Sequence, residues 1–188
     1  TRSYKQASIL DKDVNLREIT GNIVFPGFTA PKLLWIQYNK PELFEQVAKV
    51  LLPASYLGYY LTGEFFMDMS DAAGTSWLDV GNRCWSEYAL KAGNMRSDQM
   101  PKLLEGSQVA SSVSKFIADE LGIPSGVSVV AGAGDNAAAA CGVGIMKDSN
   151  AWGTALYIMR NEAGCGLGTY IEFAFRNNAG QQPTIGSV

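Results

Sequence analysis

The segment 127–146, VSVVAGAGDNAAAACGVGIM, constrains the fold of this chain more than any other. Its first residues include Val127, Val129 and Val130, which are β-branched and apolar, as is typical of a buried strand. The alanine-rich run near its end favours a helix, because alanine is the best helix former. The sequence therefore predicts a buried strand, a glycine-containing turn over residues 132–136, and a helix.

One acidic residue, Asp135, lies at this turn. Gly132 and Gly134 permit backbone angles that other residues avoid, and they allow a ligand to approach the main chain closely. Open α/β sheets bind ligands beyond the carboxyl ends of their strands, so Asp135 is the first candidate for catalysis. The alternative role is structural, because aspartate is a favoured N-cap before a helical run. The local pattern leaves both roles open.

The absence of histidine narrows the possible chemistry. The 188-residue chain cannot form a Ser-His-Asp or Cys-His nucleophile system or a histidine-ligated zinc site. Carboxylates are then the expected acid/base groups, and they suit a reaction whose proton moves late, such as phosphoryl transfer to a hydroxyl. The cysteines Cys84, Cys141 and Cys165 are widely separated, so we expect free thiols rather than disulfides or a zinc site.

Charge and hydropathy argue against nucleic-acid and membrane partners. The formal net charge is -3 and the isoelectric point is near 5.0, without a dense cluster of basic residues. The longest uncharged apolar stretch, residues 137–146, is about half of the roughly 20 residues that cross a bilayer, and no signal-peptide pattern is present. We therefore expect a cytoplasmic protein.

Cap residues and apolar spacing predict a series of short elements elsewhere. Asp68, Asp71 and Asp79 lie close together in the sequence, but their spacing is more typical of turns and caps than of a metal site. The segment GIPSG, residues 122–126, predicts a domain boundary. The other predicted elements are helices over 31–38, from 41 to about 48, over 54–61, 87–92 (capped by Ser86, ended by Gly93) and 111–121, and a strand over 49–52.

Four segments, taken in order, resemble the FGGY family of sugar kinases, most closely its xylulokinases. They are TGNIVFPGFTAPKLLW (20–35), VLLPASYLGYYLTGEFFMDMSDAAGTSWLD (50–79), DQMPKLLEGS (98–107) and VVAGAGDNAAAACGVG (129–144). The resemblance implies an α/β fold of the ribonuclease-H-like (actin-like ATPase) type, in which two lobes enclose a cleft. Residues 1–124 would be the later part of the first, sugar-binding lobe, and residues 125–188 the start of the second, nucleotide-binding lobe.

The resemblance also implies a reaction, the ATP-dependent and Mg²⁺-dependent phosphorylation of a pentulose, D-xylulose to D-xylulose 5-phosphate. By resemblance, Asp135 is the general base and Asn136 hydrogen-bonds the sugar. The family's phosphate-contacting turn is matched only in part after residue 146. We favour Gly153 and Thr154, in WGTA, over the later LGTY at 167–170.

Departures from the family pattern leave alternatives open. The family's opening strand and its later adenosine site are absent, which suggests an internal fragment that is inactive alone. Uncovered apolar surface would then favour a homo-oligomer or pairing with the missing remainder of the kinase. One alternative is an FGGY kinase for another ketose, a polyol or glycerol. Another is a non-catalytic binding or assembly module with a kinase-lobe fold, which the broken phosphate loop favours.

Overall fold

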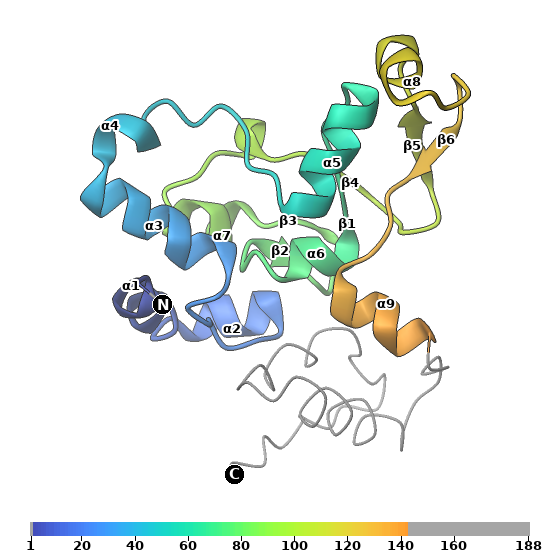
Figure 1. The fold of residues 1–188 in the computed structure, drawn as a ribbon. Coiled ribbons are helices and arrows are strands. Elements are labelled where there is room, and N and C mark those ends of the chain that lie inside the picture. The colour runs from blue at the N-terminus through green and yellow to red at the C-terminus, as the bar shows by residue number, and fades with distance from the viewer. Residues whose placement is uncertain (1, 143–188) are drawn as a thin grey trace, which may run out of the picture. The chain divides into compact units, whose positions relative to one another are not determined.

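The computed structural model describes residues 2–142, and Figure 1 shows their ribbon. The chain divides into two units, residues 1–135 and 136–188, and each is considered by itself. The helices are α1 (Tyr4–Leu10), α2 (Val14–Thr20), α3 (Thr29–Asn39), α4 (Pro41–Phe44), α5 (Pro53–Thr62), α6 (Met69–Ala73), α7 (Glu87–Ala92), η1 (Ser97–Gln99, 3₁₀), α8 (Lys115–Leu121) and α9 (Asp135–Gly142). The strands are β1 (Phe66–Asp68), β2 (Leu78–Asp79), β3 (Cys84–Trp85), β4 (Lys102–Leu104), β5 (Val109–Ser112) and β6 (Ser128–Val130).

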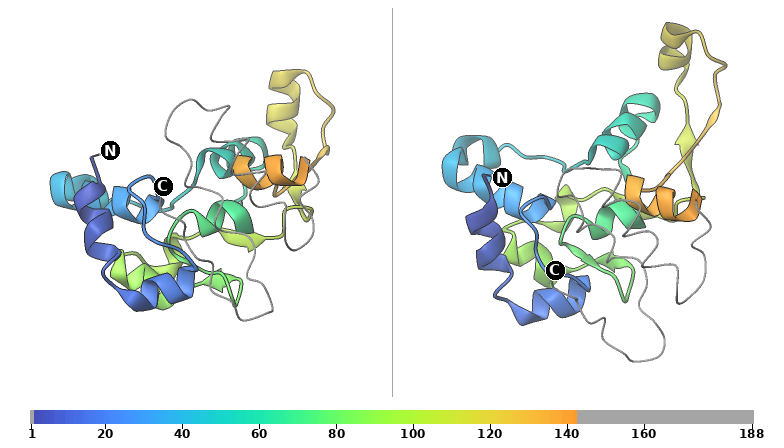
Figure 2. Two further views of the ribbon diagram at one scale, coloured as in Figure 1. Left: turned by 90° about the horizontal axis from the view of Figure 1, so that it is seen from below. Right: turned by 60° about the horizontal axis from the view of Figure 1, so that its bottom comes forward.

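The main apolar core of the first unit lies among α1, α2, α3 and α7. Trp77, Leu90 and Leu16 are almost completely buried there. A Cβ atom on Gly93 would lie 2.6 Å from Trp77 Nε1, so the end of α7 packs directly against the indole. Both views in Figure 2 show these helices on one side of the unit, with α5 and α8 on the other.

The strands of the described residues form three pairs. In the first, β1 is parallel to β4, and Phe66, Met67 and Asp68 are all buried. In the second, β2 is antiparallel to β3. In the third, β5 is antiparallel to β6, with a register irregularity between Val109 and Ser111. The parallel pair matters for the site because α6 begins directly after β1.

The prediction of a buried strand at residues 127–130 is wrong for most of its length. Val127 and Val130 are 45% and 49% exposed, and within residues 2–142 β6 pairs with β5 alone. Val129 packs against a small cluster that includes Ile117 of α8. The predicted helix over 111–121 is also too long, because its N-cap is Ser114 and the residues before it pair with β6 as β5.

The region before α5 departs from prediction as well. The helix that begins at Pro41 ends at Phe44, and residues 49–52 form no strand. Instead, the Val50 amide donates to the Gln99 carbonyl at 3.0 Å, and the Gln99 side-chain amide donates to the Val47 carbonyl at 2.7 Å. This segment is therefore held by a long-range contact that local spacing does not encode.

The predicted cap and end of α7, and free thiols at Cys84 and Cys141, are confirmed. Ser86 caps α7 by accepting a hydrogen bond from the Ala89 amide, and α7 ends at Gly93. The thiols of Cys84 and Cys141 are free and exposed, whereas Cys165 lies outside the described residues. No helix of the described part of the chain is long and apolar enough to span a membrane.

The segment 122–126, predicted to be a domain boundary, connects α8 to β6. The strands on its two sides pair with each other, and the Val113 amide donates to the Val127 carbonyl at 2.9 Å. The assignment of residues 125–188 to a second lobe stays a prediction.

Candidate active site

Asp135 lies at the end of the turn that follows β6. The turn comprises residues 131–134, and α9 begins at Asp135 itself. Asp135 is exposed rather than packed into a core. Asp135 is the first helical residue of α9, so its carboxylate lies at the N-terminal end of that helix. Catalysis and helix capping both stay predictions for this residue.

The start of the turn is hydrogen-bonded to the loop between β4 and β5. The Ala131 amide donates to the Gln108 carbonyl, and the Gly132 amide donates to the Gly106 carbonyl, both at 3.0 Å. Gly132 has a φ of +83°, which glycine adopts readily and other residues rarely do. A Cβ atom on Gly106 would lie 2.5 Å from the Gly132 carbonyl oxygen. The two backbones can approach this closely only because Gly106 lacks a side chain.

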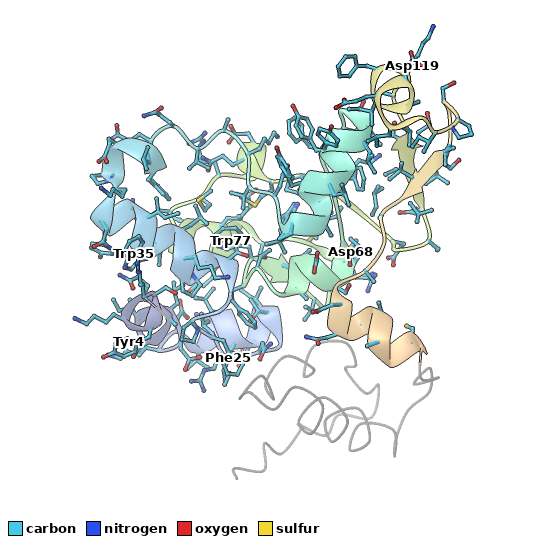
Figure 3. The ribbon with its side chains drawn as sticks, in the orientation of Figure 1. Tyr4, Phe25, Trp35, Asp68, Trp77 and Asp119 are labelled. Carbon is cyan, nitrogen blue, oxygen red and sulfur yellow. The ribbon has the colours of Figure 1, made fainter. Side chains whose placement is uncertain are left out.

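The end of the turn is hydrogen-bonded to the first residues of α6. The Gly134 amide donates to Ser70 Oγ at 2.8 Å, and Ser70 Oγ in turn donates to Asp68 Oδ1 in a short hydrogen bond. Asp68 Oδ1 also accepts from the backbone amides of Ser70 and Asp71, at 2.8 and 3.1 Å, and so caps α6. Figure 3 labels Asp68 where β1 meets α6. The side chain of Asp68 thus links a buried strand to the turn.

A second carboxylate, Asp71, lies against the same turn. A Cβ atom on Gly134 would lie 2.7 Å from Asp71 Oδ1, so the Asp71 carboxylate would have to move if residue 134 carried a side chain. Burial, with smaller contributions from the charges of Asp68 and Asp135, raises the pKa of Asp71 to about 6. The site therefore combines a backbone turn held by hydrogen bonds with a concentration of negative charge.

Asp68 and Asp79, two of the three aspartates singled out between residues 68 and 79, act in a cap and a turn, as predicted. Asp68 caps α6, and Asp79 accepts hydrogen bonds from the backbone and side-chain amides of Asn82, at 2.8 and 2.9 Å. Among the residues that the structure describes, no group of three His, Cys, Asp or Glu side chains could hold a metal ion.

A cavity of about 330 Å³ lies elsewhere in the first unit, against α3. Its lining residues are Arg2, Ser3, Lys32, Trp35 and Ile36. The Arg2 guanidinium lies 5.7 Å from the centre of a Trp35 ring. None of these residues belongs to the turn or to α6, so this cavity is separate from the candidate site.

The structure places some of the predicted site residues and adds others. Asn136 follows Asp135 in the first turn of α9, whereas Gly153 and Thr154 lie outside the described residues. The sequence analysis missed Ser70, Gly106 and Gln108, which fix the turn. Ser70 and Gly106 lie within segments that carry the family resemblance, but no local spacing indicates a contact between Ser70 and Gly134, 64 residues apart.

Comparison with known proteins identifies similar sequences and structures. The family model described as the N-terminal domain of the FGGY family of carbohydrate kinases matches residues 1–142. The xylulose kinase of Escherichia coli (strain K12) is 52% identical over 150 residues, which are 79% of this chain and 31% of that protein.

Two solved structures are similar as well. The crystal structure of a xyloylose kinase from Brucella ovis is 54% identical with a TM-score of 0.73, over 76% of this chain and 29% of that one. The xylulose kinase from Rhodospirillum rubrum is 25% identical with a TM-score of 0.74, and the match covers 78% of this chain and 31% of that one. The chain thus spans less than a third of the length of these relatives.

Proposed function

The chain belongs to the FGGY family of carbohydrate kinases, and on that premise we propose that it is part of an enzyme that transfers a phosphoryl group from ATP to a pentulose, D-xylulose, at its terminal hydroxyl. The predicted fold class is confirmed, because the described residues match part of the ribonuclease-H-like α/β fold of solved sugar kinases. The observation that carries the choice of D-xylulose is the 52% identity to a protein named xylulose kinase.

Asp135 is proposed as the general base. The sugar hydroxyl gives its proton to the Asp135 carboxylate while its oxygen forms a bond to the γ-phosphorus. The bond between that phosphorus and the bridging oxygen breaks, and ADP leaves with the electron pair. The transition state of such transfers is loose, so the base acts late and its position matters more than its strength. The exposure of Asp135 and the hydrogen-bonded turn before it support this role.

The remaining site residues complete the proposal. Magnesium enters as part of the ATP substrate, where it offsets the charge of the phosphates. Asn136, next to the base, hydrogen-bonds a sugar hydroxyl. Gly153 and Thr154 contact the nucleotide phosphates. A cytoplasmic location stays a prediction.

We propose further that the isolated chain is inactive. It spans 31% of the relative named above, and the first unit exposes large apolar side chains on α5 and α8. These are Tyr56, Leu57, Tyr60, Phe116 and Leu121. Such surface favours self-association or binding to the rest of a kinase. Sedimentation analysis of the isolated chain should show association that grows with concentration, and a monomer over a wide concentration range would contradict this expectation.

Substitution of the proposed base gives the most direct functional test. In the full-length protein that contains this chain, Asp135→Asn should lower kcat by about 10²–10⁴-fold, while the Kd for the sugar changes little. The matched control is Asp119→Asn, which alters an exposed aspartate on α8 (Figure 3) and should leave kcat unchanged. Wild-type turnover of Asp135→Asn would refute the assignment.

Two further measurements separate the alternatives. Turnover of the full-length protein with other ketoses, polyols and glycerol tests the acceptor, and a preference for any of these over D-xylulose would change the proposed substrate. Titration calorimetry with ATP and with D-xylulose tests whether the protein is instead a non-catalytic assembly module, which should bind neither.

A further inference from the structure

We propose that Ser70 is a positioning residue for the catalytic base, because its hydroxyl fixes the Gly134 peptide and thereby the direction of Asp135. This inference rests on the proposed role of Asp135. It assigns a function to a residue that lies on a different element and contacts Gly134, the residue before the base.

The Ser70 hydroxyl is oriented to accept a hydrogen bond from the turn. A serine hydroxyl has one proton to donate and two lone pairs that accept. Its proton is directed to Asp68 Oδ1, which leaves the lone pairs available to the Gly134 amide. Because the Asp68 carboxylate accepts the hydroxyl proton, the Ser70 oxygen is oriented to accept the hydrogen bond from the Gly134 amide.

The Asp68 side chain that orients Ser70 is itself held in place by several contacts. Asp68 is 3% exposed and is the last residue of β1, where it pairs with Leu104 of the parallel strand β4. Its Oδ1 is also fixed by the first amides of α6. Ser70 thus connects the exposed turn, by hydrogen bonds, to a buried strand and a capped helix.

The hydrogen bond between Gly134 and Ser70 lies at the end of the turn that is next to Asp135. The bonds to Gln108 and Gly106 hold residues 131 and 132, at the start of the turn. The bond that Ser70 accepts holds Gly134, the residue directly before Asp135. Of these three hydrogen bonds, it is the one nearest to Asp135 along the chain, so its loss should change the direction of the Asp135 side chain most. Misplacement of a reacting group by about 1 Å can cost about 100-fold in rate.

The test compares three variants of the full-length protein. Ser70→Ala removes the hydroxyl, and Ser70→Thr retains it. Ser86→Ala is the matched control. It also removes a serine hydroxyl that accepts a hydrogen bond from a backbone amide, here that of Ala89 at 3.2 Å, but at the start of a different helix. The measurements are kcat and KM for D-xylulose, the melting temperature, and hydrogen exchange of peptides that span residues 128–138.

We expect Ser70→Ala to lower kcat by about 10–100-fold while KM changes less than about threefold. Exchange in 128–138 should accelerate, and the melting temperature should fall no more than in Ser86→Ala. Ser70→Thr should recover most of kcat and of the protection from exchange. Ser86→Ala should retain the wild-type kcat and the wild-type protection from exchange in residues 128–138.

Two results would overturn the inference. One is unchanged exchange in residues 128–138 of Ser70→Ala, and the other is a kcat for Ser70→Ala equal to that of Ser86→Ala. The exchange measurement does not depend on catalysis, so it stays informative even if Asp135→Asn proves active. In that case the proposed base is wrong, while faster exchange in Ser70→Ala still shows that Ser70 holds the turn.

Discussion

The core around Trp77 and the turn before Asp135 belong to the same unit but are built in opposite ways. Trp77 and Leu90 are completely buried among apolar side chains. The turn exposes Gly132, Ala133 and Asp135, and it is held by hydrogen bonds to distant segments. In the core, apolar burial supplies stability, whereas the turn contributes little burial and defines the position of a carboxylate. Substitutions in the two regions should therefore affect different quantities.

The largest effect on stability is expected in the core. Trp77→Ala should lower the free energy of unfolding by about 3–5 kcal/mol, because it removes the largest fully buried side chain described. Turnover per folded molecule should stay near wild type. Chemical denaturation with activity measured at low denaturant checks both quantities. The control is Trp35→Ala, at a half-buried tryptophan, which should destabilise less. A loss of turnover without a loss of stability in Trp77→Ala would break the comparison.

The next effect should appear at the turn. Gly106→Ala places a Cβ atom 2.5 Å from the Gly132 carbonyl oxygen, so one backbone must move. We expect kcat to fall about 10–100-fold, because a shift of the turn would also move Asp135. Gly74→Ala is the matched control, because its Cβ atom meets only the Asp71 carbonyl at 3.4 Å. Steady-state kinetics of both variants measure this difference. Equal kcat values for Gly106→Ala and Gly74→Ala would contradict the proposed role of the turn.

The sequence predicted the local features of both regions better than their contacts. Cap residues such as Ser86 and Gly93 act within one helix, so their signals are local and the ends of α7 were predicted correctly. The glycines and Asp135 likewise marked the turn. Ser70 and Gly106 were missed because their roles depend on segments far away in the sequence. Ser111 and Ser112, the last two residues of β5, were predicted as helix for the same reason, since pairing with β6 decides their structure.

The smallest effect concerns pH. In the folded state the pKa of Asp71 is raised from 3.8 to about 6, so the folded state holds this proton more tightly than the unfolded state. The resulting stabilisation is complete below about pH 4 and is lost as the pH rises through 6. Asp71→Asn should therefore raise the free energy of unfolding by about 1–2 kcal/mol at pH 7.5, after allowance for solvent screening, and by almost nothing at pH 4.

Chemical denaturation at the two pH values measures this difference. The control is Asp119→Asn, at an exposed position on α8, which should change stability little at either pH. A gain in the Asp71→Asn variant that does not depend on pH would show that burial of the charged Asp71 carboxylate, together with repulsion from Asp68 and Asp135, is not its cause.

The position of the Asp135 carboxylate relative to the sugar is the central claim. A crystal structure of the full-length protein with D-xylulose and a non-hydrolysable ATP analogue measures it directly. The account predicts an Asp135 carboxylate oxygen within about 2.6–3.2 Å of the hydroxyl oxygen that faces the γ-phosphate. It also predicts an intact hydrogen bond from the Gly134 amide to Ser70. An Asp135 side chain turned away from the sugar, with another group at the reacting hydroxyl, would contradict it.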